Sequence, residues 1–387
     1  MRALNCFRAT CVLVLASMSF AHGASPTCVA PETKLSWPAV NPIWEMCWLP
    51  PNQSVGPRRS GMELRNVHRN GQLVMRRAHA PMLFAEYEGG SGGDCYRDWK
   101  DEPTPILAAS GVQNTLGVIP PGGPAATTSC DRSTDPVISY GTCPFMLAVP
   151  SGYSCANGVM IEDMGSYVRL TAQYRADWYM YASRFDFFVD GRMQPSFGFG
   201  NRNGTFNNVT HWHHNYWRFE FDIEGSGNNV VSTGGVDRTV EFTDLRAASG
   251  GINGGPKTWE VRNPVTGNGY RLVPGAQDYA VPTNQSGRNF HTIDFMATQA
   301  HSNEYGDSPT YDLFDCAMNK DALVNGESIA NNNQAIYYRV AVRDLTGQDS
   351  MVCKKTGPSW VPFGPWADFL FADGFDVLVP GARSDRY

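Results

Sequence analysis

The sequence predicts an all-β protein, built as a sandwich or a barrel, with little helix. Short segments that alternate between apolar and polar residues recur along the 387 residues, separated by turns rich in glycine, asparagine and proline. Glycine and proline are frequent, at 39 and 26 residues, whereas the spacing of apolar residues that is typical of helices is scarce. Short alternating strands joined by such turns are the pattern of all-β folds.

The first segment, residues 1–23, has the features of a signal peptide. Arg2 and Arg8 accompany a mostly apolar stretch from Ala9 to Ala21, and the small residues around Gly23 suit a cleavage site. The apolar stretch is too short to span a bilayer, and no later run approaches the required length. We therefore expect a protein without a membrane span that is secreted or periplasmic.

Eight cysteines remain after this segment: Cys28, Cys47, Cys95, Cys130, Cys143, Cys155, Cys316 and Cys353. An even number in an exported protein predicts disulfide bonds, and we expect Cys28 to pair with Cys47. None of the eight has the CxxC spacing that is typical of cysteine metal sites. The net charge of −6 argues against nucleic acid as a partner.

The mature chain divides into two expected parts. Residues 24–60 are rich in tryptophan and proline and are expected to form an irregular N-terminal cap. Residues 61–387 contain the expected strands, among them Gly61 to Tyr87, Val168 to Val189 and Ala335 to Val342. Residues 89–124 are rich in loops, and four cysteines between positions 95 and 155 could hold them as a binding segment, a lid or a tolerated insertion.

The most informative strand begins at His211. From Tyr216 onward its apolar and polar residues alternate, which predicts a half-buried strand. The same period places His211 and His213 on the apolar face and His214 on the polar face. Two buried imidazoles need partners, and a metal ion satisfies both because residues i and i+2 of a strand point the same way. Hydrogen-bonded core histidines, or a strand end where the alternation fails, are the alternatives.

A second strand carries an aromatic stripe on one face: Tyr179, Tyr181, Phe185, Phe187 and Val189. The turn at Asp190-Gly191 ends this strand. Tyr179 is therefore expected to point into the core, as the two histidines do. A buried tyrosine hydroxyl needs a hydrogen-bond partner, although an aromatic stripe on a strand is more often core than cofactor site.

Several motifs follow one another along the chain. His211-x-His213 is followed by Arg218-Phe-Glu-Phe-Asp222-Ile-Glu-Gly225. This segment resembles the H-x-H copper motif and the R-L-D-x-D-x-D-G segment in the catalytic domain of the copper-containing primary amine oxidases. Three further likenesses are Trp259-Glu-Val-Arg-Asn263-Pro264 with Gly269-Tyr270, Arg288-Asn-Phe290 with Glu304-Tyr305, and Gly374-Phe375-x-x-Leu378-x-Pro380. The resemblance covers the chain from about Gly61 to Pro380.

The resemblance implies a large β-sandwich as a single catalytic-type domain over residues 61–387. It implies oxidation of a primary amine by oxygen and water to an aldehyde, ammonia and hydrogen peroxide. In that family a copper ion is held by three histidines, and a quinone made from a tyrosine of the chain forms a Schiff base with the amine. Family members are usually homodimers, so a homodimer is implied here as well.

Carried over residue by residue, Tyr179 matches the tyrosine that becomes the quinone, and His211 and His213 match two of the copper ligands. The family has asparagine before this tyrosine and an acid after it, whereas this sequence has Trp178 and Met180. These two departures bear on whether the quinone forms.

The third copper ligand of the family is a histidine in a segment after the strand at Ala335. No histidine follows His301 in this sequence, so a different residue must take that place. Asp344, Asp349 and His214 are the candidates.

Two more positions resemble the family's reaction site. Tyr87 matches the tyrosine that hydrogen-bonds the quinone. The catalytic base of the family is an aspartate about fourteen residues further on, where Asp101 lies in this sequence, with Asp94 as the alternative. A solvated loop carboxylate is the alternative for each, and the residues favour it.

Two hypotheses about function follow. The first is an exported, copper- and quinone-dependent primary amine oxidase. The alternative is a protein of the same fold that has lost the chemistry and serves in binding or structure, with or without a metal ion at the histidines. A metal site of another purpose at His211, His213 and His214 is a third interpretation, and it requires a further protein ligand.

Overall fold

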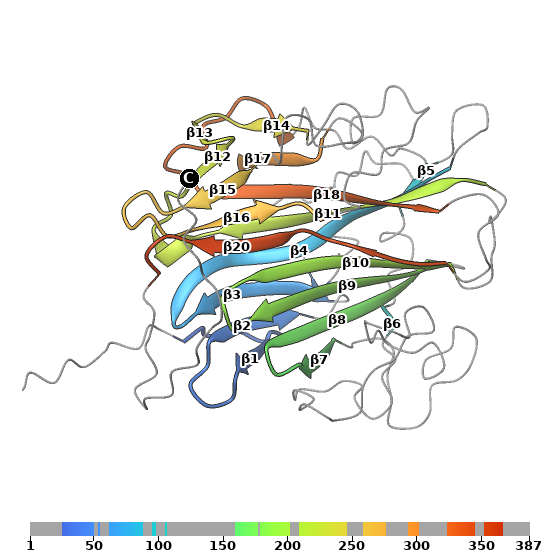
Figure 1. Ribbon diagram of the computed structural model, residues 1–387, viewed down its shortest axis with the longest axis horizontal. Helices are drawn as coiled ribbons and strands as arrows, with labels where there is room; N and C mark the ends of the chain where they lie inside the picture. The colour runs from blue at the N-terminus through green and yellow to red at the C-terminus, as the bar shows by residue number, and fades with distance from the viewer. Residues whose placement is uncertain are drawn as a thin grey trace, which may run out of the picture.

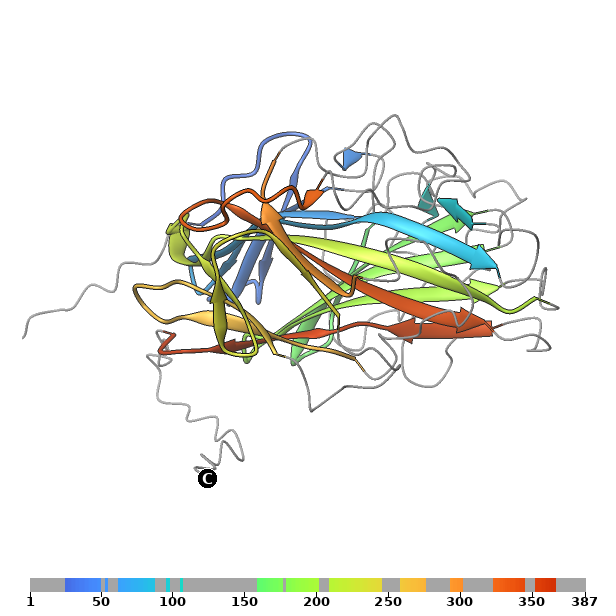
Figure 2. The ribbon, with the colours of Figure 1, turned by 90° about the horizontal axis from the view of Figure 1, so that it is seen from above.

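The computed structural model describes residues 25–49, 53–54, 62–87, 95–97, 105–106, 159–176, 179–201, 209–245, 258–275, 293–301, 323–344 and 352–366. Almost all regular structure in these ranges is antiparallel β-strand, arranged in two large sheets that pack as layers (Figure 1, Figure 2). This confirms the expected all-β sandwich with little helix. The expected signal peptide, residues 1–23, lies outside the described residues.

The first sheet, sheet A, has nine strands. In spatial order they are β1 (Thr33–Trp37), β2 (Trp44–Leu49), β3 (Glu63–Arg69), β4 (Gln72–Tyr87), β11 (His211–Phe221), β18 (Gln334–Asp344), β17 (Phe295–Gln299) and β14 (Phe242–Asp244), with β5 (Cys95–Arg97) paired to β4. The strand that begins at His211 is therefore central, between β4 and β18.

The second sheet, sheet B, has eleven strands. In spatial order they are β13 (Val236–Arg238), β12 (Val230–Thr233), β15 (Trp259–Arg262), β16 (Gly269–Val273), β20 (Ser359–Phe363), β10 (Met193–Asn201), β9 (Tyr179–Phe188), β8 (Tyr167–Ala176) and β6 (Pro105–Ile106), with β19 (Val352–Thr356) paired to β10 and β7 (Met160–Asp163) paired to β8. The strand that carries the aromatic stripe, β9, lies between β8 and β10 (Figure 1).

The main core fills the space between the two sheets, as aromatic pairs across it show. Trp44 of β2 packs on Phe187 of β9 with ring centroids 5.0 Å apart, and Trp259 of β15 stacks on Phe295 of β17 at 4.9 Å. Such pairs contribute about 0.5–1.5 kcal/mol each beyond the burial of their surface. The period of two along each strand delivers these side chains to the inner faces, as the sequence pattern predicts.

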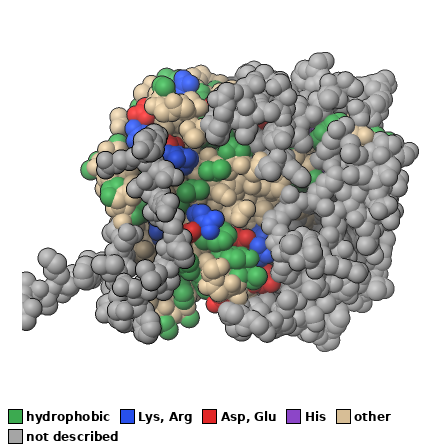
Figure 3. Space-filling view, in the orientation of Figure 1, with side chains coloured by type: hydrophobic (Ala, Val, Ile, Leu, Met, Phe, Trp, Pro, Cys, Tyr) green, Lys and Arg blue, Asp and Glu red, His purple; other side chains and the backbone are tan. Residues whose placement is uncertain are grey.

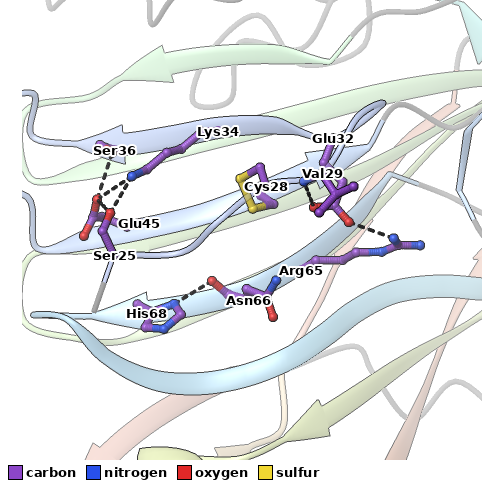
Figure 4. The surroundings of a disulfide bond; sticks show 11 residues. Ser25, Cys28, Val29, Glu32, Lys34, Ser36, Glu45, Arg65, Asn66 and His68 are labelled. Carbon is purple, nitrogen blue, oxygen red and sulfur yellow. Dashed lines mark hydrogen bonds and ion pairs between the residues drawn. A yellow bond between two sulfur atoms is a disulfide. The ribbon is translucent and has the colours of Figure 1, made fainter. Parts of the chain in front are cut away.

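Residues 24–60 were expected to form an irregular cap. They contain two regular strands, β1 and β2, at one edge of sheet A. Residues of β1 pair with β2, and β2 pairs with β3. The predicted disulfide between Cys28 and Cys47 is present and ties the start of this segment to β2 (Figure 4). Glu32 accepts a hydrogen bond from Arg65 of β3 at 2.8 Å in the same region (Figure 4).

The strand β11 differs from the expected half-buried strand, because both of its faces are buried from His211 to Phe219. The inner face packs into the main core with Trp217 and Phe219. The outer face, which carries the polar residues of the alternation, lies against a second apolar cluster. That cluster consists of Phe84, Tyr216, Ile293, Met296, Leu323, Ala335 and Tyr337. The alternation in the sequence distinguishes two faces, but it cannot show that a second layer covers the polar one.

Within the described residues, no helix has the length and apolar composition needed to cross a membrane.

Candidate metal and tyrosine site

His211 and His213 lie at the start of β11 with their side chains fully buried. Their ring centroids are 5.0 Å apart and their planes are nearly perpendicular. Both face the space between the sheets, because His213 contacts a residue of β9 in the opposite sheet. The predicted pair of inward-facing imidazoles is therefore present.

The tautomer of His211 follows from its hydrogen bond. Its Nδ1 lies 2.8 Å from the carbonyl oxygen of Val209, and a carbonyl only accepts, so Nδ1 carries the proton. The lone pair of the neutral ring then resides on Nε2. Metal-binding histidines commonly donate their second ring N–H to a carbonyl in this way, which fixes the ring and leaves the other nitrogen as the ligand.

Tyr181 is the partner of His213, and the sequence did not single it out. Its hydroxyl lies 2.8 Å from Nδ1 of His213, and the phenol is only 1% exposed. Its ring also stacks on Phe197 of β10, with centroids 5.7 Å apart. The available signal was its place in the aromatic stripe, two residues after Tyr179. When Nδ1–H donates to the phenol, Nε2 of His213 becomes a metal ligand atom in the same manner as Nε2 of His211.

Tyr87 lies at the end of β4, directly opposite His211 in the strand register. Its ring stacks on the His211 imidazole, with centroids 5.1 Å apart and planes 23° from parallel. The structure thus brings the predicted residue Tyr87 to the predicted histidine pair, as a packing partner of His211.

The described side chains bring two imidazoles together at this site. Among the described residues, the one cluster of three or more His, Cys, Asp or Glu donors within reach of each other is Cys28, Glu32 and Cys47, whose two cysteines form the disulfide. Asp344 is the last residue of β18 and is the register partner of His211 on the side away from Tyr87. The side chain of Asp344 lies outside the described part of the chain, so its role as a third ligand stays a prediction from the sequence.

His214 is not a third ligand at this pair, because it points to the other face of β11. Its Nδ1 lies 3.2 Å from Nη1 of Arg339 and its Nε2 lies 3.1 Å from Oε2 of Glu86. A guanidinium only donates, so Nδ1 must accept, and Nε2–H then donates to the carboxylate. Both ring nitrogens of a neutral His214 are thereby engaged in hydrogen bonds.

These contacts belong to a buried set of charged residues that we name the outer-face network: Glu86, His214, Asp294 and Arg339. Every member is at most 2% exposed. Arg339 donates to Asp294 at 2.5 Å and to the carbonyl of Ile293 at 2.9 Å. Burial alone lowers the pKa of the Arg339 guanidinium, but the Asp294 carboxylate reverses this and holds the pKa above its usual value. The network anchors the outer face of β11 and β18 behind the histidine pair.

No described histidine is visible on the face shown in Figure 3. This agrees with the full burial of His211, His213 and His214. The histidine site is therefore internal.

His79 of β4 is fully buried and lies opposite Arg218 of β11. Burial lowers the pKa of His79 well below its usual value, and the charges of Arg218, Arg77 and Arg65 lower it further. The unfolded chain takes up a proton near the ordinary histidine pKa of about 6.5, whereas the folded protein resists it. We therefore expect the stability of the protein to fall as the pH drops below that value.

Melting temperatures measured between pH 7.5 and pH 5 test this expectation. The substitution His79→Gln removes the titrating ring, so this variant should lose less stability over that interval than the parent does. The acidic residues contribute equally to both proteins and cancel in the comparison. Parallel melting curves for parent and variant would contradict the role assigned to His79.

The side chains of the remaining predicted residues lie outside the described part of the chain. Tyr179 begins β9, and its backbone pairs with Ala176 and Asn201, but its side chain lies outside the described part. Asp94, Asp101 and Asp349 lie outside the described residues. Their roles remain predictions from the sequence.

Three solved structures of amine-oxidizing enzymes resemble this architecture. A copper-containing benzylamine oxidase from Hansenula polymorpha superposes with a TM-score of 0.59 at 14% identity, over 89% of this chain and 64% of that one. An amine oxidase from Aspergillus nidulans gives 0.53 at 14% identity, over 92% and 55%. A lysyl oxidase from Pichia pastoris gives 0.54 at 13% identity, over 93% and 56%.

The chain has an amine-oxidase-like β-sandwich fold. It spans less than two thirds of the length of each of these three proteins. No known family profile matches the sequence, and no curated protein matches it. At this level of identity the likeness establishes the fold, and function must be argued from the site.

Proposed function

We propose that this protein is an exported primary amine oxidase that holds a copper ion at His211 and His213. The proposal depends on the two buried imidazoles of His211 and His213. His213 contacts Tyr181, which lies on the same strand, β9, as Tyr179. The amine-oxidase-like fold supports it, and the disulfide between Cys28 and Cys47 supports export. Residues 61–387 would act as one catalytic-type domain.

Each residue has a defined part in this proposal. His211 and His213 ligate through Nε2, with Nδ1 bound to the Val209 carbonyl and the Tyr181 phenol respectively. Asp344 is the proposed third ligand, and its backbone pairs with His211. A copper ion supplies a redox centre for oxygen, and Tyr179 is the proposed precursor of the quinone that accepts electrons from the amine.

Aromatic side chains pack around the histidine pair. Tyr87 covers His211 by stacking, and Tyr181 closes the side of His213 toward sheet B. Asp101 is the proposed base that takes the proton from the carbon next to the amine nitrogen. The overall reaction converts amine, oxygen and water to aldehyde, ammonia and hydrogen peroxide.

Expression in the presence of copper and air tests the proposal. The parent protein should develop visible absorbance that shifts on reaction with phenylhydrazine, and it should release hydrogen peroxide with a primary amine. Tyr179→Phe should remove the absorbance and the activity. The control Tyr167→Phe lies on β8 beside Phe188, at the other end of β9 from Tyr179, and should retain the reactive chromophore. A colourless parent protein that nevertheless contains copper would rule out the oxidase.

A second candidate function is a non-catalytic protein of the same fold that still binds a metal ion. It is favoured by the donor count, because among the described residues no group of three or more His, Cys, Asp or Glu donors includes His211 and His213. It is also favoured by Trp178 and Met180, which replace the asparagine and the acid beside the family tyrosine. Copper uptake without any phenylhydrazine reaction would select this function.

A further inference from the structure

Asn215 follows His213 by two residues on β11 and so shares its inward face. It is 1% exposed, and within the described part of the chain neither amide atom, Oδ1 nor Nδ2, has a hydrogen-bond partner. Its register neighbours on either side are Leu83 and Val340, both apolar and buried. An amide in such surroundings is strongly unfavourable unless something else supplies its hydrogen bonds.

Ser183 has the same property on the opposite sheet. It follows Tyr181 by two residues on β9, it is 2% exposed, and its Oγ has no hydrogen-bond partner within the described residues. Its register neighbours are Ala172 and Phe197, which offer no polar side-chain atom. The hydroxyl and the amide are thus both buried between the two sheets, among apolar side chains.

The two strands run in the same sense across the sandwich (Figure 1). Both end beside the turn between β3 and β4. Arg69 donates to the carbonyl of Asp190 just after β9, and Gln72 donates to Glu224 just after β11. Because Tyr181 meets His213 near the start of both strands, we expect the next inward residues, Ser183 and Asn215, to face each other.

We infer that Ser183 and Asn215 bind an internal water molecule between the sheets, beside the Tyr181–His213 pair. Stacked sheets lie about 10 Å apart, and the long side chains of Tyr181 and His213 close that distance by a direct hydrogen bond. Serine and asparagine are shorter, so their polar atoms stay separated by about the 5–6 Å that one water with two hydrogen bonds spans. The indole Nε1 of Trp217, the next inward residue of β11, is a third buried donor without a partner in the described part.

The chemistry of the groups fits water. A buried water makes two to four hydrogen bonds to polar groups that otherwise lack partners. Here the amide offers a donor and an acceptor, the hydroxyl offers both, and the indole offers a donor. The inference needs neither the copper ion nor the amine, so it stands or falls independently of the proposed function.

A double-mutant cycle on thermal stability tests the shared water. Asn215→Leu and Ser183→Ala should each lower the melting temperature, because each removes one partner and leaves the other buried without its bond. The double variant should lose less than the sum of the two single losses, because it leaves no amide or hydroxyl at the site. Ser232→Ala provides the matched control: Ser232 is also a buried serine of sheet B whose hydroxyl has no partner among the described residues, but it lies on β12. Its effect should add to that of Asn215→Leu.

A dry site gives the opposite result and overturns the inference. In that case Asn215→Leu raises the melting temperature, and the effects of the two substitutions add. A high-resolution crystal structure of the parent protein decides the question even when a variant fails to fold. It should show a solvent peak within hydrogen-bond distance of Asn215 and Ser183, and continuous apolar packing around the amide would refute the shared water.

Discussion

The variant His213→Ala is expected to lose copper binding while it keeps the sandwich. Removing this side chain deletes one of the two imidazoles at the site and also deprives the Tyr181 phenol of its 2.8 Å partner. Loss of a residue that only supports a ligand typically lowers metal affinity by about 10–100-fold, and loss of a ligand should exceed that. Competition titration with a copper chelator gives the affinity, and elemental analysis gives the copper content of each purified protein.

Two further variants make the experiment specific. Tyr181→Phe keeps the ring but removes the hydroxyl, so its copper affinity should fall between those of the parent and His213→Ala. His68→Ala removes a histidine from β3, where the ring contacts the carbonyl of Asn66, and should leave copper binding unchanged. If His213→Ala bound copper as tightly as the parent, the histidine pair would not be the metal site, and the proposed oxidase would lose its foundation.

The variant Arg339→Met is expected to lose about 3–5 kcal/mol of folding stability, the usual result of removing one partner from a buried ion pair. The guanidinium is fully buried and bonds to Asp294, to His214 and to the carbonyl of Ile293. Methionine fills similar space but leaves the Asp294 carboxylate charged in the core. Denaturant unfolding of parent and variant gives the difference in the free energy of unfolding.

Removing both charges separates the ion pair from the packing. The double variant Arg339→Met with Asp294→Asn should recover much of the lost stability, because both charged members of this ion pair are then absent. The control Arg192→Met breaks the ion pair with Asp190 at the surface, where the two side chains are 44% and 50% exposed. Such pairs contribute about 0–1 kcal/mol. Equal losses at Arg339 and Arg192 would show that the outer-face network is not a buried ionic anchor.

Much of the fold could be predicted because it depends on local periodicity. The turn at Asn70-Gly71 separates β3 from β4, the turn after Phe188 separates β9 from β10, and the strand expected from Ala335 appears as β18. Alternation also placed His211 and His213 on one inward face. The disulfide between Cys28 and Cys47 could also be predicted, because the two cysteines are close in the sequence and lie at the paired strands β1 and β2.

The partners of these side chains could not be predicted, because they come from strands far apart in the sequence. Tyr181 is 32 residues from His213, and Glu86 is 128 residues from His214. His214 was expected on a polar face, yet that face is covered by a second layer that includes Phe84 and Tyr337. Alternation distinguishes the two sides of a strand, but it carries no information about what packs on either side.

The sequence by itself determined that short alternating strands would form a β-protein. It also determined that β11 would carry two imidazoles on one face, because successive side chains of a strand point to opposite faces. Only the tertiary structure decided which groups those imidazoles meet. It placed β9 across from β11, so that Tyr181 reaches His213. It also buried the charges of Arg339 and Asp294 behind them. Contacts of this kind arise when two sheets stack, and their register is set by the packing of the whole core.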